Sequence, residues 1–457
     1  MSSSERGDVD KLAELFRETP PSPVMTSGAT APIDGPELPV QQPPQRPPRR
    51  RGPWIALGVV TAVALAAGGY TAACALAPLT KPTVTLAGEA EVVFSNDLAA
   101  VQASVDEQVG PTAVGWQGDE TVITNDPTAY PIASISKLVT LLVALEQQPL
   151  EPGTDGPSYT WTGVDSARQA QYLALDGVAF PVPIGTEVTT RQMLTLALLP
   201  SANDFAAAYA AWVIGDNEVF SAAVADWAAR NGLESVYLAE PTGMDEANVA
   251  SAADVVRIGQ LALANPAIAE LTRLPSAELP WGIGTVENTN PLLGTVPGVI
   301  GLKTGRSSSA GYNLVAAQEA DASGRAVVKI TAVLGRGSES ERADGSAALL
   351  GTMDATAQPT ELVAEQKKVG TAATIDGLTI PLLTDGAAST VLLPGESASA
   401  TTTLSALGEG PAGQAAGSVQ VTSPTGELEV PVITETSIVA PDLWWRLTHP
   451  AQVFGWE

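Results

Sequence analysis

The sequence contains one cysteine and one histidine, and each scarcity excludes a class of functional site. In 457 residues these are Cys74 and His449. A lone cysteine forms no disulfide within the chain, so no disulfide framework supports the fold. A single histidine excludes a histidine-rich metal site and argues against a Ser-His-Asp triad. We therefore expect no metal and no cofactor.

Positive charge is also scarce. The chain has 23 Lys and Arg residues against 50 Asp and Glu residues, which gives a formal net charge of -27. Such a surface repels the phosphates that dominate affinity for nucleic acid, so DNA and RNA are not expected partners. The acidity is instead typical of the solvated surface of an exported protein.

The N-terminal part of the chain predicts a membrane anchor. Residues 1–51 are polar and rich in proline, which is typical of a disordered tail. Residues 53–79 carry no charge and are long enough to cross the ~30 Å hydrocarbon layer as a helix. Arginines precede this segment and none follows closely, so the tail is predicted to be cytoplasmic and the later domains extracellular. The alternatives are a signal peptide cleaved near Ala75-Leu76-Ala77 and a lipid-modified Cys74.

The remaining chain predicts two folded domains. After a linker at 80–90, helices followed by antiparallel strands predict an α+β domain at 91–358. The helical patterns lie at Ser134–Leu145, Thr190–Leu199, Ala202–Val213 and Ala252–Ala264, and the strands at Val299–Lys303, Tyr312–Ala317 and Ala326–Leu334. Residues 369–440 predict a small all-β sandwich, with strands at Leu378–Leu383, Ser389–Leu393, Val419–Val421 and Leu428–Val430. In the aromatic segment 441–457, we expect the tryptophans to cap that sandwich rather than rest at a membrane surface.

A serine and a lysine three residues apart, Ser134 and Lys137, form the first candidate for chemistry. Ser134 begins an apolar helix, so Lys137 lies on the same face within reach of its hydroxyl. A lysine amine with its ordinary pKa near ~10.4 is a poor base at neutral pH, so burial and a neighbouring cation must lower this pKa. Lys303 is the predicted cation. Ser136 has no lysine three residues later and is predicted to bond back to a carbonyl of its helix.

Two further short motifs follow in the chain. Ser201-Ala202-Asn203 enters a helix, where Ser201 alone predicts an N-cap; beside a Ser-Lys pair its hydroxyl would relay a proton, and Asn203 would hold a substrate amide. Lys303-Thr304-Gly305 ends an apolar strand and alone predicts a hairpin edge. Functionally, Lys303 would face the nucleophile, Thr304 would bind a substrate carboxylate, and Gly305 would admit the ligand alongside the strand.

Together these motifs resemble the penicillin-binding protein and serine β-lactamase superfamily. Pro131–Ser134, Leu199–Asp204, Pro241–Met244 and Gly301–Leu314 are similar to the low-molecular-mass D-alanyl-D-alanine carboxypeptidases. The resemblance implies a β-lactamase/transpeptidase-like fold with a helical lobe, and a trailing β domain. It also implies that peptidoglycan stem peptides ending in D-Ala-D-Ala acylate Ser134 and that the acyl-enzyme is then hydrolysed. β-Lactam antibiotics would bind covalently to the same serine as inhibitors. The backbone amides of Ser134 and Arg306 would form the oxyanion hole.

One departure from the family pattern leaves the substrate open. Better-known members carry an arginine between two asparagines, where it helps bind a terminal carboxylate, but this chain has Asn288-Thr289-Asn290. Arg306 is the candidate substitute, because its guanidinium fork suits a carboxylate. The alternatives are therefore an endopeptidase acting on cross-links, a β-lactamase, or a scaffold that binds wall peptides without turnover. Glu240-Pro241 superficially resembles a β-lactamase deacylation motif, but Thr242-Gly243-Met244 fits the carboxypeptidases better.

Overall fold

The computed structural model describes residues 52–456, so the predicted disordered tail at 1–51 lies outside the described residues. The chain divides into two compact units, and the boundary between them in the sequence falls between Ala72 and Ala73. Most of helix α1 (Gly52–Leu76) belongs to the first unit. Its residues Trp54–Leu76 are long and apolar enough to cross a membrane, by length and composition. The helix ends three residues before the predicted limit at Leu79, close to Pro78.

An antiparallel sheet organises the α+β domain, which spans residues 99–356. Within the described chain its strand order is β11 (Val299–Ser307), β12 (Gly311–Ala322), β13 (Arg325–Arg336), β3 (Thr112–Trp116) and β4 (Val122–Thr124). The three predicted strands in this region are therefore confirmed, with longer bounds. Leu314 and Ala316 join one hydrophobic cluster, while Val315 and Ala317 join another. The period of two thus buries both faces of the sheet.

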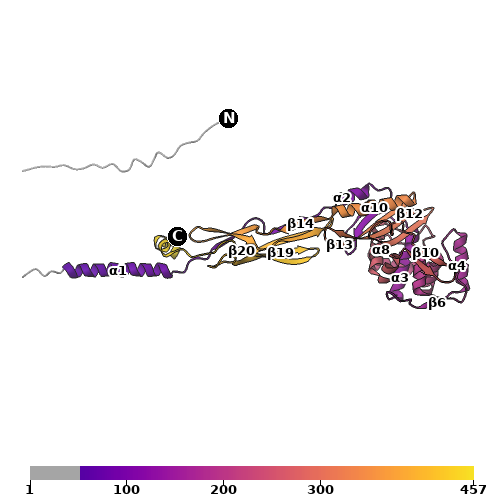
Figure 1. Cartoon of the computed structure of the whole chain (residues 1–457), viewed down its shortest axis with the longest axis horizontal. Helices are drawn as coiled ribbons and strands as arrows, with labels where there is room; N and C mark the ends of the chain where they lie inside the picture. Colours follow the sequence, from indigo (N-terminus) through magenta and orange to yellow (C-terminus); the bar gives the residue numbers. More distant parts are fainter. Residues whose placement is uncertain (1–51, 457) are drawn as a thin grey trace, which may run out of the picture. The chain divides into compact units, whose positions relative to one another are not determined.

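Helices cover both faces of this sheet (Figure 1). One cluster joins the sheet to α2 (Ala99–Asp106) and α10 (Glu339–Thr356). The other joins it to α8 (Ala252–Ala264) and to a helical lobe. That lobe contains α3 (Ser136–Gln147), α4 (Gly163–Ala174), α5 (Thr190–Leu198), α6 (Asn203–Val213), α7 (Asn217–Arg230) and α9 (Pro266–Thr272). Two-stranded ribbons complete it: β5 (Tyr130–Pro131) with β8 (Val249–Ala250), β6 (Ser158–Thr160) with β7 (Glu187–Thr189), and β9 (Ser276–Leu279) with β10 (Gly284–Glu287).

Side-chain caps explain why two of the predicted helices begin where they do. The Thr189 hydroxyl accepts from the backbone N–H of Gln192 at 3.2 Å, and the Gln192 side chain accepts from the Thr189 N–H at 2.9 Å. Ser251 accepts from the N–H of Asp254 in the same way, at 3.1 Å. Such caps satisfy N–H groups that have no partner within the helix. The predicted starts of α5 and α8 are confirmed.

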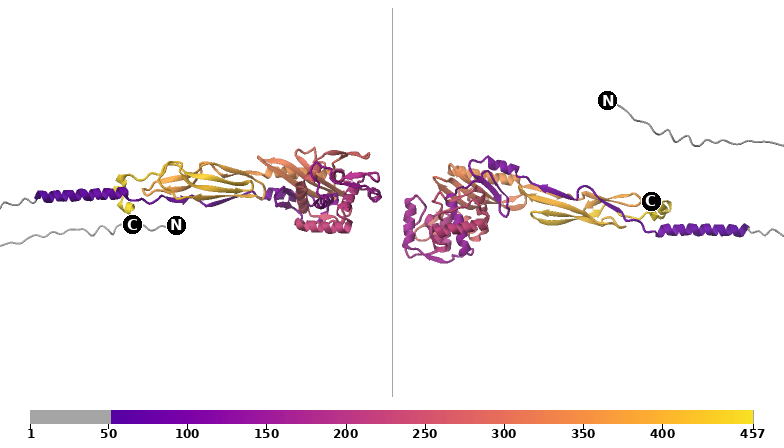
Figure 2. Two further views of the ribbon diagram at one scale, coloured as in Figure 1. Left: turned by 90° about the horizontal axis from the view of Figure 1, so that it is seen from below. Right: turned by 180° about the vertical axis from the view of Figure 1, so that it is seen from behind.

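The second domain is all β, as predicted, but it draws on both ends of the described chain. Seven strands there form one antiparallel sheet in the order β1 (Thr83–Leu86), β15 (Lys368–Ala373), β16 (Thr379–Thr384), β20 (Gly426–Thr434), β19 (Ala415–Ser423), β18 (Ser397–Leu404) and β2 (Glu91–Ser95). The ribbon of β14 (Gln358–Val363) and β17 (Ala388–Leu392) shares its core. Figure 2 shows the indigo N-terminal strands running beside the yellow C-terminal ones.

The predicted linker at 80–90 is wrong, because it contains β1, which pairs with β15. The α+β boundary at 91 is also wrong, because β2 pairs with β18 of the β domain. The physical reason is burial of apolar side chains, since Val84 and Phe94 pack against the core of the β domain. Neither strand pairs with a neighbour in sequence.

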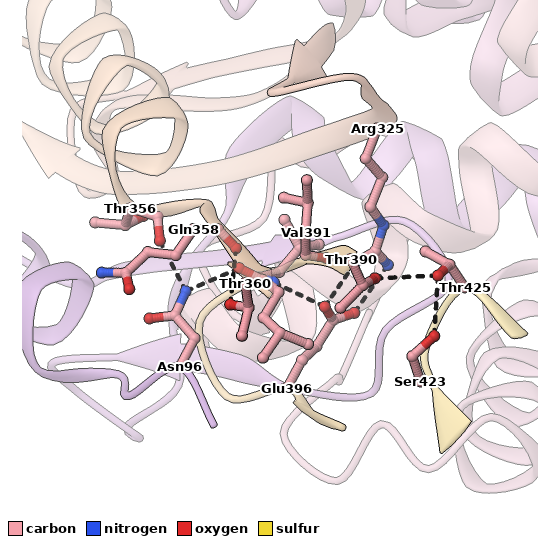
Figure 3. A network of polar contacts seen from close by, with 12 residues as sticks. Asn96, Arg325, Thr356, Gln358, Thr360, Thr390, Val391, Glu396, Ser423 and Thr425 are labelled. Atoms are coloured by element: carbon pink, nitrogen blue, oxygen red, sulfur yellow. Dashed lines mark hydrogen bonds and ion pairs between the residues drawn. The ribbon is translucent and has the colours of Figure 1, made fainter. Parts of the chain in front are cut away.

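The two domains meet at a network of polar contacts around the buried Asn96 (Figure 3). Its side-chain amide donates to the carbonyls of Thr356 and Leu392 at 2.8 and 2.9 Å, which ties together the two chain segments that cross between the domains. Arg325 and Glu396 form a two-pronged ion pair at 2.6 and 2.8 Å. These contacts join the start of β13 to the loop before β18.

The C-terminal segment forms α11 (Leu443–Thr448) and α12 (Pro450–Phe454). Trp444 is 73% exposed, so the prediction that the aromatic residues cap the sandwich is wrong for this side chain. Trp445 stacks on His449 with 4.6 Å between ring centroids. Arg446 donates instead to the carbonyls of residues 74, 75 and 77, where α1 ends. Those carbonyls lack partners within a helix, which explains the contact.

Candidate active site

Ser134 lies in a single 3₁₀ turn, Ala133–Ile135, directly before α3. The helix itself begins two residues later than predicted. Ala133 has φ of 47°, a conformation that residues other than glycine rarely adopt. Such backbone strain persists only where surrounding contacts enforce it, and it concentrates at functional sites. As expected, the hydroxyl of Ser136 donates back to the Ala133 carbonyl, at 2.7 Å.

The amine of Lys137 is fully buried and makes three hydrogen bonds. Its Nζ lies 2.8 Å from Ser134 Oγ, 2.6 Å from Asn203 Oδ1 and 2.7 Å from the carbonyl oxygen of Thr242. Burial lowers the pKa of this amine from 10.5 to about 7. A large fraction of Lys137 is therefore neutral at physiological pH and can accept the serine proton.

The cause of this pKa shift differs in part from the expected one. Desolvation is the largest cause, and the carboxylates of Glu240 and Asp204 act in the opposite direction by favouring the ammonium form. Lys303, the predicted neighbouring cation, is not among the causes of the shift; instead, Lys137 lowers the pKa of Lys303. Its own pKa is lowered well below 10.5 by burial, and further by the charges of Lys137 and Arg342. Burial rather than a second cation therefore lowers the pKa of Lys137.

Two glycines allow other segments to approach the backbone of the Ser134 turn. A Cβ placed on Gly243 would lie 2.0 Å from the Ala133 carbonyl oxygen, and φ there is 84°. A Cβ on Gly305 would lie 2.5 Å from the Ile132 carbonyl oxygen and 3.3 Å from the Ser134 nitrogen. Real Cβ atoms do not fit at these separations, so both positions require glycine. The turn is held between β11 and the loop around Gly243.

The Lys-Thr-Gly motif lies inside β11 rather than at its end, because the strand continues to Ser307. Lys303 is 1% exposed, and its Nζ has no hydrogen-bond partner among residues 52–456. The Thr304 hydroxyl lies 2.6 Å from the hydroxyl of Thr289. Thr289, which stands where better-known family members carry an arginine, therefore contacts Thr304, the predicted carboxylate binder, directly.

The alternative interpretation, in which Ser201 is the N-cap of α6, is wrong, because Ala202 occupies the N-cap position. Ser201 has φ of 68°, and its buried hydroxyl finds no partner in the described part of the chain. An unpaired buried hydroxyl costs free energy, which argues for a role outside the folded chain's own contacts. Asn203 accepts a hydrogen bond from Lys137, but no hydrogen bond joins the Ser201 hydroxyl to Ser134.

Arg306 follows Gly305 on β11 and is exposed. Its guanidinium carbon lies 5.1 Å from the centroid of the Tyr312 ring, and the buried Arg342 lies 5.6 Å from the same centroid. Arg342 also donates to the Gly305 carbonyl at 3.4 Å. The aromatic ring thus holds Arg306 beside the Lys-Thr-Gly strand through cation-π attraction.

Residues 121–336 match the family model described as D-alanyl-D-alanine carboxypeptidase. The chain is 34% identical over 194 residues to D-alanyl-D-alanine carboxypeptidase DacB2 of Mycobacterium tuberculosis, covering 41% of this chain and 62% of that protein. It is 31% identical over 232 residues to a D-alanyl-D-alanine endopeptidase of Escherichia coli, covering 48% of this chain and 69% of that protein. The chain belongs to the D-alanyl-D-alanine carboxypeptidase family.

The fold is that of this family as well. The crystal structure of penicillin binding protein 5 from Haemophilus influenzae aligns with a TM-score of 0.51 and 20% sequence identity. The alignment covers 73% of this chain and 98% of that structure. The predicted β-lactamase/transpeptidase-like architecture, followed by a β domain, is therefore confirmed.

The sequence motifs leave out several residues that shape this family site. Thr242 acts through its backbone carbonyl, which carries no residue-type signal. Arg342 lies on α10, and no spacing in the sequence links it to Gly305. Tyr312 lies within the matched segment Gly301–Leu314, but its place in a predicted strand gives no sign of its contact with Arg306. Glu240 was interpreted only through its superficial β-lactamase resemblance, yet its carboxylate contacts Thr242 at 2.8 and 2.6 Å.

We predict that acylation of the protein by a penicillin depends on the protonation state of Lys137. Because only the neutral amine accepts a proton and its pKa is about 7, the rate should rise with pH through about 7 and then level off. A stopped-flow series with a fluorescent penicillin between about pH 5 and 9 measures this rising limb of the pH–rate profile. Ser134→Ala provides the unreactive control. A limb near the ordinary lysine value would contradict the assignment of a buried base.

Proposed function

We propose that this protein is a serine-type D-alanyl-D-alanine carboxypeptidase that removes the terminal D-alanine from peptidoglycan stem peptides. The observation that carries the proposal is the 2.8 Å contact between Lys137 Nζ and Ser134 Oγ, within the region that matches the family model. With no histidine among the contacts of Ser134 in residues 52–456, the lysine is the base within reach.

In the proposed reaction, Lys137 takes the proton of the Ser134 hydroxyl while Oγ bonds to the carbonyl carbon of the penultimate D-alanine. The backbone N–H groups of Ser134 and Arg306 stabilise the oxyanion. The C–N bond to the terminal D-alanine then breaks. The unpaired hydroxyl of Ser201 gives its proton to the departing amine and takes up the proton held by Lys137, which becomes neutral again. Water hydrolyses the ester that remains on Ser134, with Lys137 again as the base.

Substrate binding in this proposal uses the groups that surround the Ser134 turn. The Nδ2 of Asn203 donates to a substrate amide, since its Oδ1 already accepts from Lys137. The buried amine of Lys303, which has no hydrogen-bond partner among the described residues, donates to the substrate, while Thr304 and Arg306 bind the terminal carboxylate. Gly305 leaves room for the peptide to lie along β11. A β-lactam ring would acylate Ser134 by the same route.

Incubation of the detergent-solubilised full chain with a pentapeptide ending in D-Ala-D-Ala should release free D-alanine. Ser134→Ala should abolish this release, because it removes the oxygen that attacks the substrate. Ser104→Ala, on α2, is the matched control and should retain full activity. Chromatographic assay of D-alanine measures both variants. Undiminished release by Ser134→Ala would falsify the assignment of the nucleophile.

One observation favours a second candidate, a D,D-endopeptidase that cleaves cross-links. Thr289 stands between Asn288 and Asn290, and its hydroxyl bonds to Thr304, so no arginine at this position reads a terminal carboxylate. The Escherichia coli relative is named an endopeptidase. The choice between the two activities therefore depends on Arg306.

Arg306→Ala should selectively weaken hydrolysis of peptides with a free terminal carboxylate. A hydrogen bond to a charged group contributes about 1.5–3 kcal/mol, which corresponds to roughly a 10- to 100-fold loss of kcat/KM. An amidated pentapeptide should show little change, and Arg306→Lys should recover only part of the loss. Arg230→Ala, on the exposed end of α7, is the control. Equal loss on both peptides would contradict carboxylate recognition by Arg306.

We also propose that α1 anchors the protein in the cell membrane with the N-terminus in the cytoplasm and both folded domains outside. The support is an uncharged helix of sufficient length that follows Arg49-Arg50-Arg51. Protease added to intact spheroplasts should then degrade the domains and leave a cytoplasmic N-terminal tag protected. Protection of the domains instead would contradict this orientation.

A further inference from the structure

Glu240 lies at the centre of a compact loop and directs both carboxylate oxygens at that loop. Oε1 accepts from the backbone N–H groups of Gly243, Met244 and Asp245 at 2.6, 2.9 and 3.3 Å. Oε2 accepts from the N–H and the hydroxyl of Thr242 at 2.8 and 2.6 Å. Asn248 Nδ2 approaches Oε1 at 3.3 Å. Every partner is a donor, so the loop is shaped around a negative charge.

This loop docks on α3 through two successive carbonyl groups. The Pro241 carbonyl accepts from the Thr140 hydroxyl at 2.8 Å, and the Thr242 carbonyl accepts from Lys137 Nζ at 2.7 Å. Lys137 and Thr140 are three residues apart and so share one face of the helix. Gly243 then packs against the Ala133 carbonyl. The loop therefore fixes the amine of Lys137 and the turn that carries Ser134 at once.

We propose that Glu240 is a positioning residue for the base: its carboxylate folds residues 241–245 into the one shape that presents the Thr242 carbonyl to Lys137 Nζ. The proposal rests on the proposed function, because it concerns the base of that reaction. With its carboxylate oxygens bound to backbone N–H groups, Glu240 does not serve as a second base for water, which sets this site apart from a β-lactamase-like deacylation centre.

The charges around Lys137 give this role a measurable consequence. Asp204 and Glu240 both raise the pKa of Lys137, and the nearby Lys303 has its own pKa lowered by burial and by Lys137. Glu240 itself is near Lys137 and Tyr172, and Asp245 belongs to its own loop. Removing the charge of Glu240 leaves Lys137 with less stabilisation of its ammonium form. Loss of the Thr242 acceptor acts in the same direction.

Glu240→Gln tests the proposal because it keeps the size of the side chain but inserts a donor. Whichever way the amide turns, its NH₂ group faces backbone N–H donors, so the loop must shift. We expect the maximal rate of acylation by a fluorescent penicillin to fall about 10²-fold, as misplacement of a catalytic group by about 1 Å does. The rising limb of the pH–rate profile should also shift to lower pH than in the unaltered protein.

Two further variants make the outcome decisive, and every protein is measured as the full chain in detergent with folding checked by thermal unfolding. Glu240→Asp keeps the charge, so its pH limb should stay close to the original while its rate falls. Glu246→Gln removes an exposed carboxylate from the same loop and should change neither quantity. A Glu240→Gln protein that is folded, with an unchanged limb, overturns the positioning role. Failure of the unaltered protein to react with the fluorescent penicillin would instead contradict the proposed function.

Discussion

The buried amine of Lys137 is the constraint around which the site is arranged. An amine without water must be neutral or must have its protons accepted, and here a hydroxyl, an amide oxygen and a carbonyl oxygen provide three acceptors. Those acceptors come from the Ser134 turn, from the start of α6 and from the loop after Glu240. The same burial that lowers the pKa of Lys137 therefore requires three distant segments to converge on it.

This convergence depends on close backbone contacts as much as on charge. Gly243 and Gly305 approach the Ser134 turn from two sides, at separations that a Cβ would not permit. Ala133 and Ser201 take positive φ values nearby. The strain is offset by the hydrophobic clusters on both faces of the central sheet, which fix the helices and strands that carry these residues. A rigid scaffold thus holds a strained site.

The sequence predicts the parts of this arrangement that local chemistry determines. The caps at Thr189 and Ser251 place two helices, and the Ser-x-x-Lys spacing brings the Ser134 hydroxyl within hydrogen-bonding distance of the Lys137 amine. It does not predict β1 and β2 as parts of the β domain, because their partners lie hundreds of residues later in the chain. Nor does it predict the Thr242 carbonyl or the Arg342 guanidinium beside Gly305, because tertiary packing alone brings them there.

The central claim is that Ser134, activated by Lys137, is the nucleophile. Peptide mapping by mass spectrometry after reaction with a penicillin tests it most directly, because the covalent adduct identifies the attacking atom. The adduct should lie on Ser134 in a single stoichiometric product. An adduct on Ser136 or Ser201, or a folded protein that never forms one, would contradict the account.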